Sequence, residues 1–165
     1  MTSSLPLRER CFDYFFIVMF SLFIVTCITT DLVPIFSGGI DPTSSNPIIQ
    51  ANYKYGAGCD PLFLHPPVWM WIVIGLSGFV YFPFYFVLVA AFIKGWNRIQ
   101  VPALIYGTSI TVITGVLVFG VEFFGEPQYR CQVILKFLPF NLPYVLVPLL
   151  LLFRMRRELP FKRKF

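Results

Sequence analysis

Long apolar segments separated by short polar and charged stretches dominate this sequence. No charged side chain occurs between Pro67 and Ile93, and about 20 apolar residues in a helix are enough to cross a bilayer. Three other segments have the same character. The pattern predicts an all-α integral membrane protein, a four-transmembrane-helix bundle whose helices cover about 11–33, 67–93, 101–124 and 133–153.

Prolines lie inside two of these segments, and we therefore expect Pro-kinked helices. Pro83 should bend the second helix, because proline removes a backbone hydrogen bond. Three prolines predict an irregular first half of the fourth helix, namely Pro139, Pro143 and Pro148. Residues 35–66 are rich in Gly, Ser, Asn and Pro and are predicted to form a loop, whose later part, Ile48 to Tyr55, could cap the mouth of the bundle.

The composition excludes several other classes of protein. The chain is 57% hydrophobic and only 13% charged, about half the charged fraction of a soluble domain. Its net charge of +5 comes from Lys and Arg at the ends of the apolar segments, where they contact lipid head groups. Nucleic acid is therefore not an expected partner, whereas membrane lipid is.

The distribution of basic residues predicts the orientation. Of the 13 Lys and Arg residues, only Lys54, Arg130 and Lys136 fall on the side opposite the termini. The positive-inside rule then places residues 1–10 and a basic tail, 154–165, in the cytosol, on either side of a membrane domain at 11–153. The first segment could also be a signal peptide, but its long core and missing cleavage site favour a retained helix.

Two acids lie next to the apolar segments on the non-cytosolic side. Asp31 ends the first segment and Asp60 precedes the second. We expect both to face one pocket for an apolar ligand with a polar or cationic group, with only one of them ionised. The alternatives are a solvated acid at a helix end for Asp31 and a turn residue before proline for Asp60. Glu122 lies on the same side and is interpreted as an interfacial residue, with a third pocket acid as the alternative.

The cysteines leave one question open. Cys59 and Cys131 fall in non-cytosolic loops, where an oxidising lumen could pair them, but the sequence does not show whether they meet. Cys11 and Cys27 are interpreted as packing residues. No His and Cys spacing suggests a metal site, and no cofactor is expected.

Several motifs together resemble those of a known family. They are Asp31-Leu32-Val33-Pro34, Asp60-Pro61-Leu62, Pro66-Pro67-Val68-Trp69, Phe92-Ile93-Lys94-Gly95, Pro102-Ala103-Leu104-Ile105-Tyr106 and Pro143-Tyr144-Val145-Leu146-Val147-Pro148. Over nearly the whole chain they resemble the sigma-2 receptor (transmembrane protein 97) family of the EXPERA superfamily, which is related to the emopamil-binding sterol isomerase. The resemblance implies an EXPERA-like four-helix homodimer of the endoplasmic reticulum membrane. It also implies binding of sterols and amphiphilic amines, with a role in cholesterol homeostasis or lipid trafficking.

The resemblance also implies roles for individual residues. Asp31 corresponds to the acid that pairs with a ligand amine, and Asp60 to a protonated acid that hydrogen-bonds to it. Tyr144 corresponds to a pocket tyrosine. At two positions on the second helix the sequence departs from the family, since Ser77 replaces a glutamate and Tyr81 a glutamine.

A third departure lies on the third helix, where Ile113 replaces a ligand-contacting threonine and leaves Thr111 or Thr114 as substitutes. The candidate ligand-binding residues are therefore Asp31, Asp60, Tyr144, Thr111, Thr114, Tyr81 and Ser77.

Three functional classes remain in view. We expect a binding protein rather than an enzyme, because the second helix lacks the His and Glu of the sterol isomerase and His65 lies in the preceding loop. A sterol double-bond isomerase and a trafficking or chaperone partner of another membrane protein are the alternatives. The end of the chain, Lys162-Arg163-Lys164-Phe165, resembles a dibasic endoplasmic-reticulum retrieval signal, although it could equally lie on anionic lipid.

Overall fold

Four long helical spans form the body of the protein. The structure is a computed structural model that describes residues 4–162. Helices long and apolar enough to cross a membrane cover Cys11–Phe36, Val68–Lys94, Asn97–Phe124 and Ile134–Met155. The remaining elements of the described chain are also helical, with no strand among them. The predicted all-α, four-span membrane fold is confirmed.

Each of the first three spans is interrupted by a π-helical turn. The first consists of α1 (Cys11–Cys27), the π turn Ile28–Leu32 and α2 (Val33–Phe36). The second consists of α5 (Val68–Leu76), the π turn Ser77–Tyr81 and α6 (Phe82–Lys94). The third begins with a 3-10 turn, Asn97–Ile99, and continues through α7 (Gln100–Val112), the π turn Ile113–Val118 and α8 (Phe119–Phe124).

Proline explains two of these π turns. Pro34 and Pro83 lie in the first residues of α2 and α6, directly after a π turn. A proline inside a helix has no N–H to donate and its ring clashes with the carbonyl four residues earlier, so the preceding turn widens. The distortion expected at Pro83 therefore takes the form of the π turn Ser77–Tyr81.

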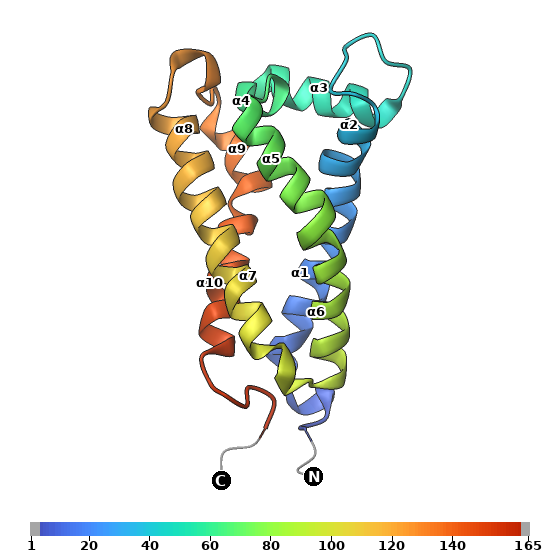
Figure 1. The fold of residues 1–165 in the computed structure, drawn as a ribbon, viewed down its shortest axis with the longest axis vertical. Coiled ribbons are helices and arrows are strands. Elements are labelled where there is room, and N and C mark those ends of the chain that lie inside the picture. Colours follow the sequence, from blue (N-terminus) through green and yellow to red (C-terminus); the bar gives the residue numbers. More distant parts are fainter. Residues whose placement is uncertain (1–3, 163–165) are drawn as a thin grey trace.

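The fourth span is divided, as its prolines predict. It consists of α9 (Ile134–Asn141), which contains Pro139, and α10 (Pro143–Met155), with Leu142 between them. Along the spans α1 packs against α6, and α7 packs against α10 (Figure 1). Gly107 lets the second pair approach closely, because a Cβ there would lie 2.9 Å from Leu152 Cδ2.

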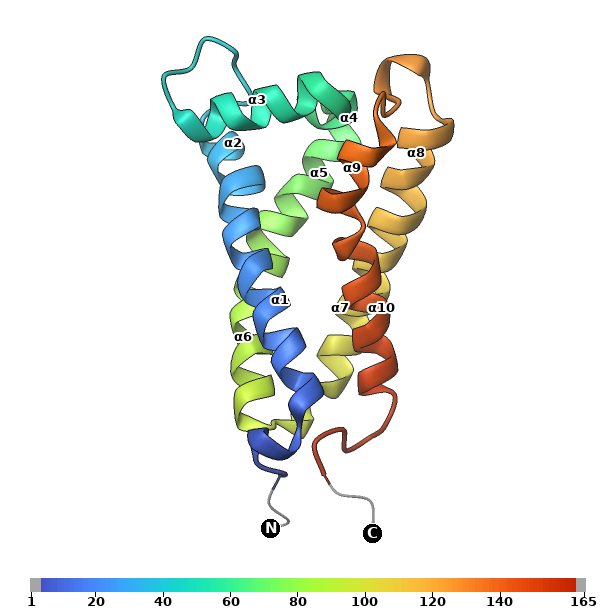
Figure 2. The ribbon, with the colours of Figure 1, turned by 180° about the vertical axis from the view of Figure 1, so that it is seen from behind.

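A helix covers one end of the bundle where a loop was expected. Residues 47–59 form α3 (Pro47–Cys59), and α4 (Pro61–Leu64) follows it. The side chain of Asn46 caps α3 by accepting a hydrogen bond from the N–H of Ile48 at 2.9 Å, and Pro47 suits the first turn. The helix lies across the end of the bundle opposite the termini (Figures 1 and 2), which we call the cap end.

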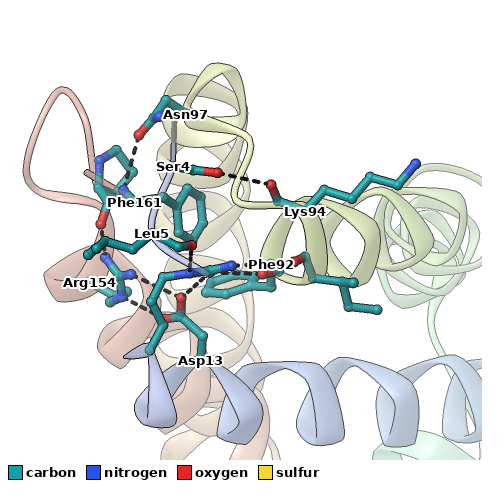
Figure 3. Close-up of polar contacts among 11 residues, drawn as sticks. Ser4, Leu5, Asp13, Phe92, Lys94, Asn97, Arg154 and Phe161 are labelled. Carbon is teal, nitrogen blue, oxygen red and sulfur yellow. Dashed lines mark hydrogen bonds and ion pairs between the residues drawn. The ribbon is translucent and has the colours of Figure 1, made fainter. Parts of the chain in front are cut away.

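A buried ion cluster holds the other end, which we call the terminal end, together. The carboxylate of Asp13 is 1% exposed and accepts hydrogen bonds from Arg10 at 2.5 Å and from Arg154 at 2.8 and 3.1 Å. Arg10 also donates to the main-chain oxygen of Phe92 at 2.8 Å. The cluster therefore joins α1, α6 and α10 (Figure 3).

The segment after α10 is tied to this cluster. The ring of Phe161 is buried between the guanidinium carbons of Arg10 and Arg154, 4.9 and 5.0 Å from its centre. Its N–H donates to Asn97 at 3.0 Å and its carbonyl accepts from Leu5 at 2.9 Å (Figure 3). Residues 1–3 and 163–165, which include most of the predicted retrieval signal, lie outside the described chain.

The ion cluster predicts a large effect of one isosteric substitution. Asp13→Asn should lower the free energy of unfolding by about 3 kcal/mol, because it leaves two guanidinium groups near the core without their anion. Thermal unfolding of the detergent-purified protein measures this change. Glu158→Gln removes an exposed carboxylate near the same end and should change stability little; equal stability of the two variants would contradict the prediction.

Candidate functional site

A cavity of about 400 Å³ lies among the spans at the cap end. Most of its wall is apolar, with Met70, Val73, Ile74, Ile110 and Val118 among the lining residues. The polar groups on the wall come from all four spans, from α3 and from the junction of α3 with the next short helix. Such a cavity can hold a largely hydrocarbon ligand and orient it through a few polar contacts.

Asp31 reaches the cavity from the π turn of the first span. Ser77, which starts the π turn of the second span, donates its hydroxyl to Asp31 Oδ2 at 2.6 Å. Thr30 donates to Oδ1 at 3.3 Å. The two spans approach closely here, since a Cβ on Gly78 would lie 2.8 Å from Leu32 Cδ2. Ser77 thus holds Asp31 in place, at a position where the resemblance to the sigma-2 receptor family implies a glutamate.

Asp60 enters the wall from the junction of α3 and α4. Its Oδ1 caps α4 by accepting from the N–H of Phe63 at 2.9 Å, and its Oδ2 accepts from the hydroxyl of Tyr55 at 3.0 Å. Asn141 of α9 donates to the Tyr55 oxygen at 2.8 Å. Burial raises the pKa of Asp60, and these hydrogen bonds act in the opposite direction. Burial also raises the pKa of Tyr55, which therefore remains a donor.

Asp31 and Asp60 line the same cavity but do not form the direct pair that the resemblance implies. The hydroxyls of Ser77 and Thr30 donate to Asp31, whereas the hydroxyl of Tyr55 and the N–H of Phe63 donate to Asp60. The capping role of Asp60 fixes its side chain at the start of α4. The two acids therefore form separate polar positions on the wall.

Glu122 lies close to the end of the third span and does not line the cavity, but its side chain is buried rather than exposed at the interface. The residue is 1% exposed, and neither carboxylate oxygen has a hydrogen-bond donor within residues 4–162. Its carboxyl group interacts with that of Asp60. The end of α8 turns back here, because the N–H of Cys131 donates to the Glu122 carbonyl at 3.0 Å, and this turn encloses the side chain.

The other candidate residues divide into two groups. Tyr144, Ser77, Tyr81 and Thr114 line the cavity. The hydroxyl of Tyr81 donates to Ser109 at 2.9 Å. Thr111 is not on the wall; its hydroxyl donates to the carbonyl of Gly107 one turn back, at 2.7 Å. Such bonding to the helix backbone is common for threonine in an apolar helix.

Five polar lining residues were missed in the sequence, namely Thr26, Thr30, Asn52, Tyr55 and Asn141. Asn141 could have been found, because an amide between two prolines of a membrane helix must meet another polar group. Asn52 belongs to α3 and donates to the main-chain oxygen of Thr29, in the π turn of the first span, at 2.7 Å. Finding it requires knowledge that α3 covers the bundle.

The cysteines and acids show no sign of a metal centre. Cys59 and Cys131, whose pairing the sequence left open, are free thiols in the structure. The part of the chain that is described has no group of three or more His, Cys, Asp and Glu side chains arranged to hold a metal ion.

The fold and the cavity define a class: a multi-pass membrane protein whose helices enclose a mainly apolar cavity with acidic groups on its wall. The model of the EXPERA family (expanded EBP superfamily) matches residues 48–155. The chain therefore belongs to the EXPERA family. No curated protein matches it. Family membership indicates a sterol-related membrane protein, whereas relation to the sigma-2 receptor in particular is a proposal.

The hydrogen bonds of Tyr55 connect the helix α3 to Asp60 and Asn141 on the cavity wall, and we expect them to stabilise α3. Tyr55→Phe removes the donor to Asp60 and the acceptor of Asn141, which should cost about 1 kcal/mol. Hydrogen exchange of the α3 amides should then become about fivefold faster, as measured by mass spectrometry. In the control Tyr53→Phe, on the same helix, the lost hydroxyl has no hydrogen bond with a described residue; equal exchange in both variants would disprove the link.

Proposed function

We propose that the protein is a sigma-2-receptor-like, non-enzymatic binding protein for sterols and cationic amphiphilic ligands. It holds the ligand in the cavity at the cap end and acts in sterol homeostasis or lipid trafficking. The observation that carries this proposal is the position of Asp31 on the wall of that cavity.

Asp31 suits a cationic group because of what surrounds it. The neutral hydroxyls of Ser77 and Thr30 donate to it, and the ion pairs found in the described residues all involve Asp13 instead. An acid at membrane depth without a basic partner is costly. An ammonium group on a ligand would supply that partner, and a hydroxyl could donate to the same oxygens.

The remainder of the wall suits a hydrocarbon body. A volume of about 400 Å³ falls within the usual range of small-molecule sites, roughly 300–1,000 Å³. Ile74 and Ile110, which line it, are both 5% exposed. A rigid polycyclic or long aliphatic ligand would fill such a space and bury apolar surface.

The cellular setting is part of the proposal. The basic residues at the terminal end support cytosolic termini under the positive-inside rule, and the resemblance supports the endoplasmic reticulum membrane and a homodimer. The cavity would then open toward the lumenal half of the bilayer.

One observation favours an enzyme as the second candidate. Glu122 interacts with Asp60, which lines the cavity, and an isomerase must donate one proton and remove another. Conversion of an 8-ene sterol to its 7-ene isomer by the purified protein, lost in a Glu122→Ala variant, would establish this activity. The absence of product would exclude it for that substrate.

The role of Asp31 can be tested by one isosteric substitution. Asp31→Asn keeps an acceptor for Ser77 but removes the charge, so affinity for a cationic amphiphile should fall by about 30-fold, the lower end of the effect of breaking a buried charge pair. Equilibrium binding of a radiolabelled amine to membranes measures this. Asp41→Asn, in an exposed loop toward the same end, should leave affinity unchanged.

Labelling with a photoreactive sterol serves as the folding control. A neutral sterol does not need the charge of Asp31, so labelling should persist in Asp31→Asn. Unchanged amine affinity in a variant that still takes up the sterol would refute the proposed site.

A further inference from the structure

The carboxyl group of Glu122 is buried without a hydrogen-bond donor among residues 4–162, and the proposed ligand-binding site gives no reason for an ionised acid at this position. Its side chain is buried, and both of its oxygens are without a donor in the described part of the protein. A buried carboxylate with no compensating hydrogen bond or cation is highly unfavourable. A protonated carboxyl group, by contrast, is neutral and can itself donate one hydrogen bond.

Asp60 is the acceptor that such a proton would meet. The two carboxyl groups are near enough to interact electrostatically, and close like charges disfavour ionisation of both. Their donors are unequal, because Asp60 accepts from Tyr55 and Phe63 whereas Glu122 accepts from no described donor. Hydrogen bonds to a carboxylate stabilise its charged form. Negative charge is therefore more stable on Asp60 and the proton more stable on Glu122.

None of the other described titratable groups around the pair supplies a buried positive charge that would allow both carboxyl groups to ionise. The titratable groups that face it are Tyr55 and Cys59 from α3, Cys131 from the loop after α8, and Lys136 from α9. Burial raises the pKa of Cys59 and of Cys131, so both thiols stay neutral. Lys136 is exposed to the outside and its charge is screened there.

We propose that Glu122 and Asp60 form an acid pair that holds a single proton, with Glu122 as the donor and Asp60 as the acceptor. Glu122 is a positioning residue, because Asp60 lines the cavity and Glu122 does not. The proton keeps Asp60 oriented and leaves the pair with one negative charge. This arrangement differs from the family pattern, in which the second acid is a neutral partner of the first.

The pair also defines the chemistry of the ligand. Asp60 would offer a fixed, negatively charged acceptor at a position separate from Asp31, so the cavity suits a molecule with two hydrogen-bond donors, such as a hydroxyl and an ammonium, on one apolar body. This consequence rests on the proposed function. The shared proton itself does not, and it can be tested without any ligand.

The test is the pH dependence of stability of the ligand-free protein. Above about pH 5 an ordinary glutamate in the unfolded chain has lost its proton, whereas folded Glu122 retains it, so wild-type stability should fall as the pH rises toward about 8. In Glu122→Gln the amide N–H replaces the donor and nothing titrates. The unfolding equilibrium constant of the wild type should then rise by up to about tenfold more per pH unit than that of the variant, as measured by denaturation in detergent.

Two further variants complete the design. Glu126→Gln, an exposed neighbour on the loop after α8, should keep the wild-type pH profile. Glu122→Leu has no donor and should be less stable than Glu122→Gln at neutral pH. A wild-type pH profile in Glu122→Gln would overturn the proposal, and so would failure of that variant to fold, because a neutral donor is what the pair requires. Infrared spectra should show a protonated carboxyl band that Glu122→Gln lacks; an unchanged band would likewise overturn it.

Discussion

The arrangement of the spans depends on the ion pairs that the carboxylate of Asp13 forms with Arg10 and Arg154. In a bilayer, apolar helices gain little from burying apolar surface against one another, so close packing and directional polar contacts decide their positions. The ion cluster reaches α1, α6 and α10, and the N–H of Phe161 extends the connection to Asn97 at the start of the third span. All four spans are thereby fixed at the terminal end.

The cap end is organised in the opposite way. At the terminal end two cations surround one carboxylate. At the cap end Asp31 accepts from hydroxyl groups and Asp60 from a hydroxyl and a backbone N–H, and neither acid has an ion pair with a described residue. Charged partners therefore hold the terminal end together, whereas neutral donors hold the two acids on the cavity wall. The helix α3 separates this acidic region from the outside, and Asn52 and Tyr55 attach it to the spans.

The sequence predicts the spans better than their contacts. Hydropathy identifies which segments enter the membrane, and topology alone brings Asp31, Asp60 and Glu122 to one side. The partners of a side chain depend on how its helix is rotated about its axis, and neither hydropathy nor topology specifies this rotation. The burial of Glu122 beside the turn after α8 is not visible in the sequence. Of the two threonines considered as substitutes, Thr114 lines the cavity whereas Thr111 bonds to its own helix. A cap formed by residues 48–55 was suggested by the sequence, but its helical form was missed because the Gly and Asn content resembles that of a loop, although Asn46 and Pro47 mark the start of α3.

The π turns have a consequence for how this protein is compared with its relatives. Each adds roughly one residue to a regular helix, which rotates everything beyond it by about 100° around the helix axis. Asp31 and Ser77 meet because both lie in such turns. A relative that lacks one of the extra residues would present a different neighbour to the same aspartate, although every motif around it remained recognisable. Equivalence of positions in this family therefore has to be judged in three dimensions rather than by counting along the chain.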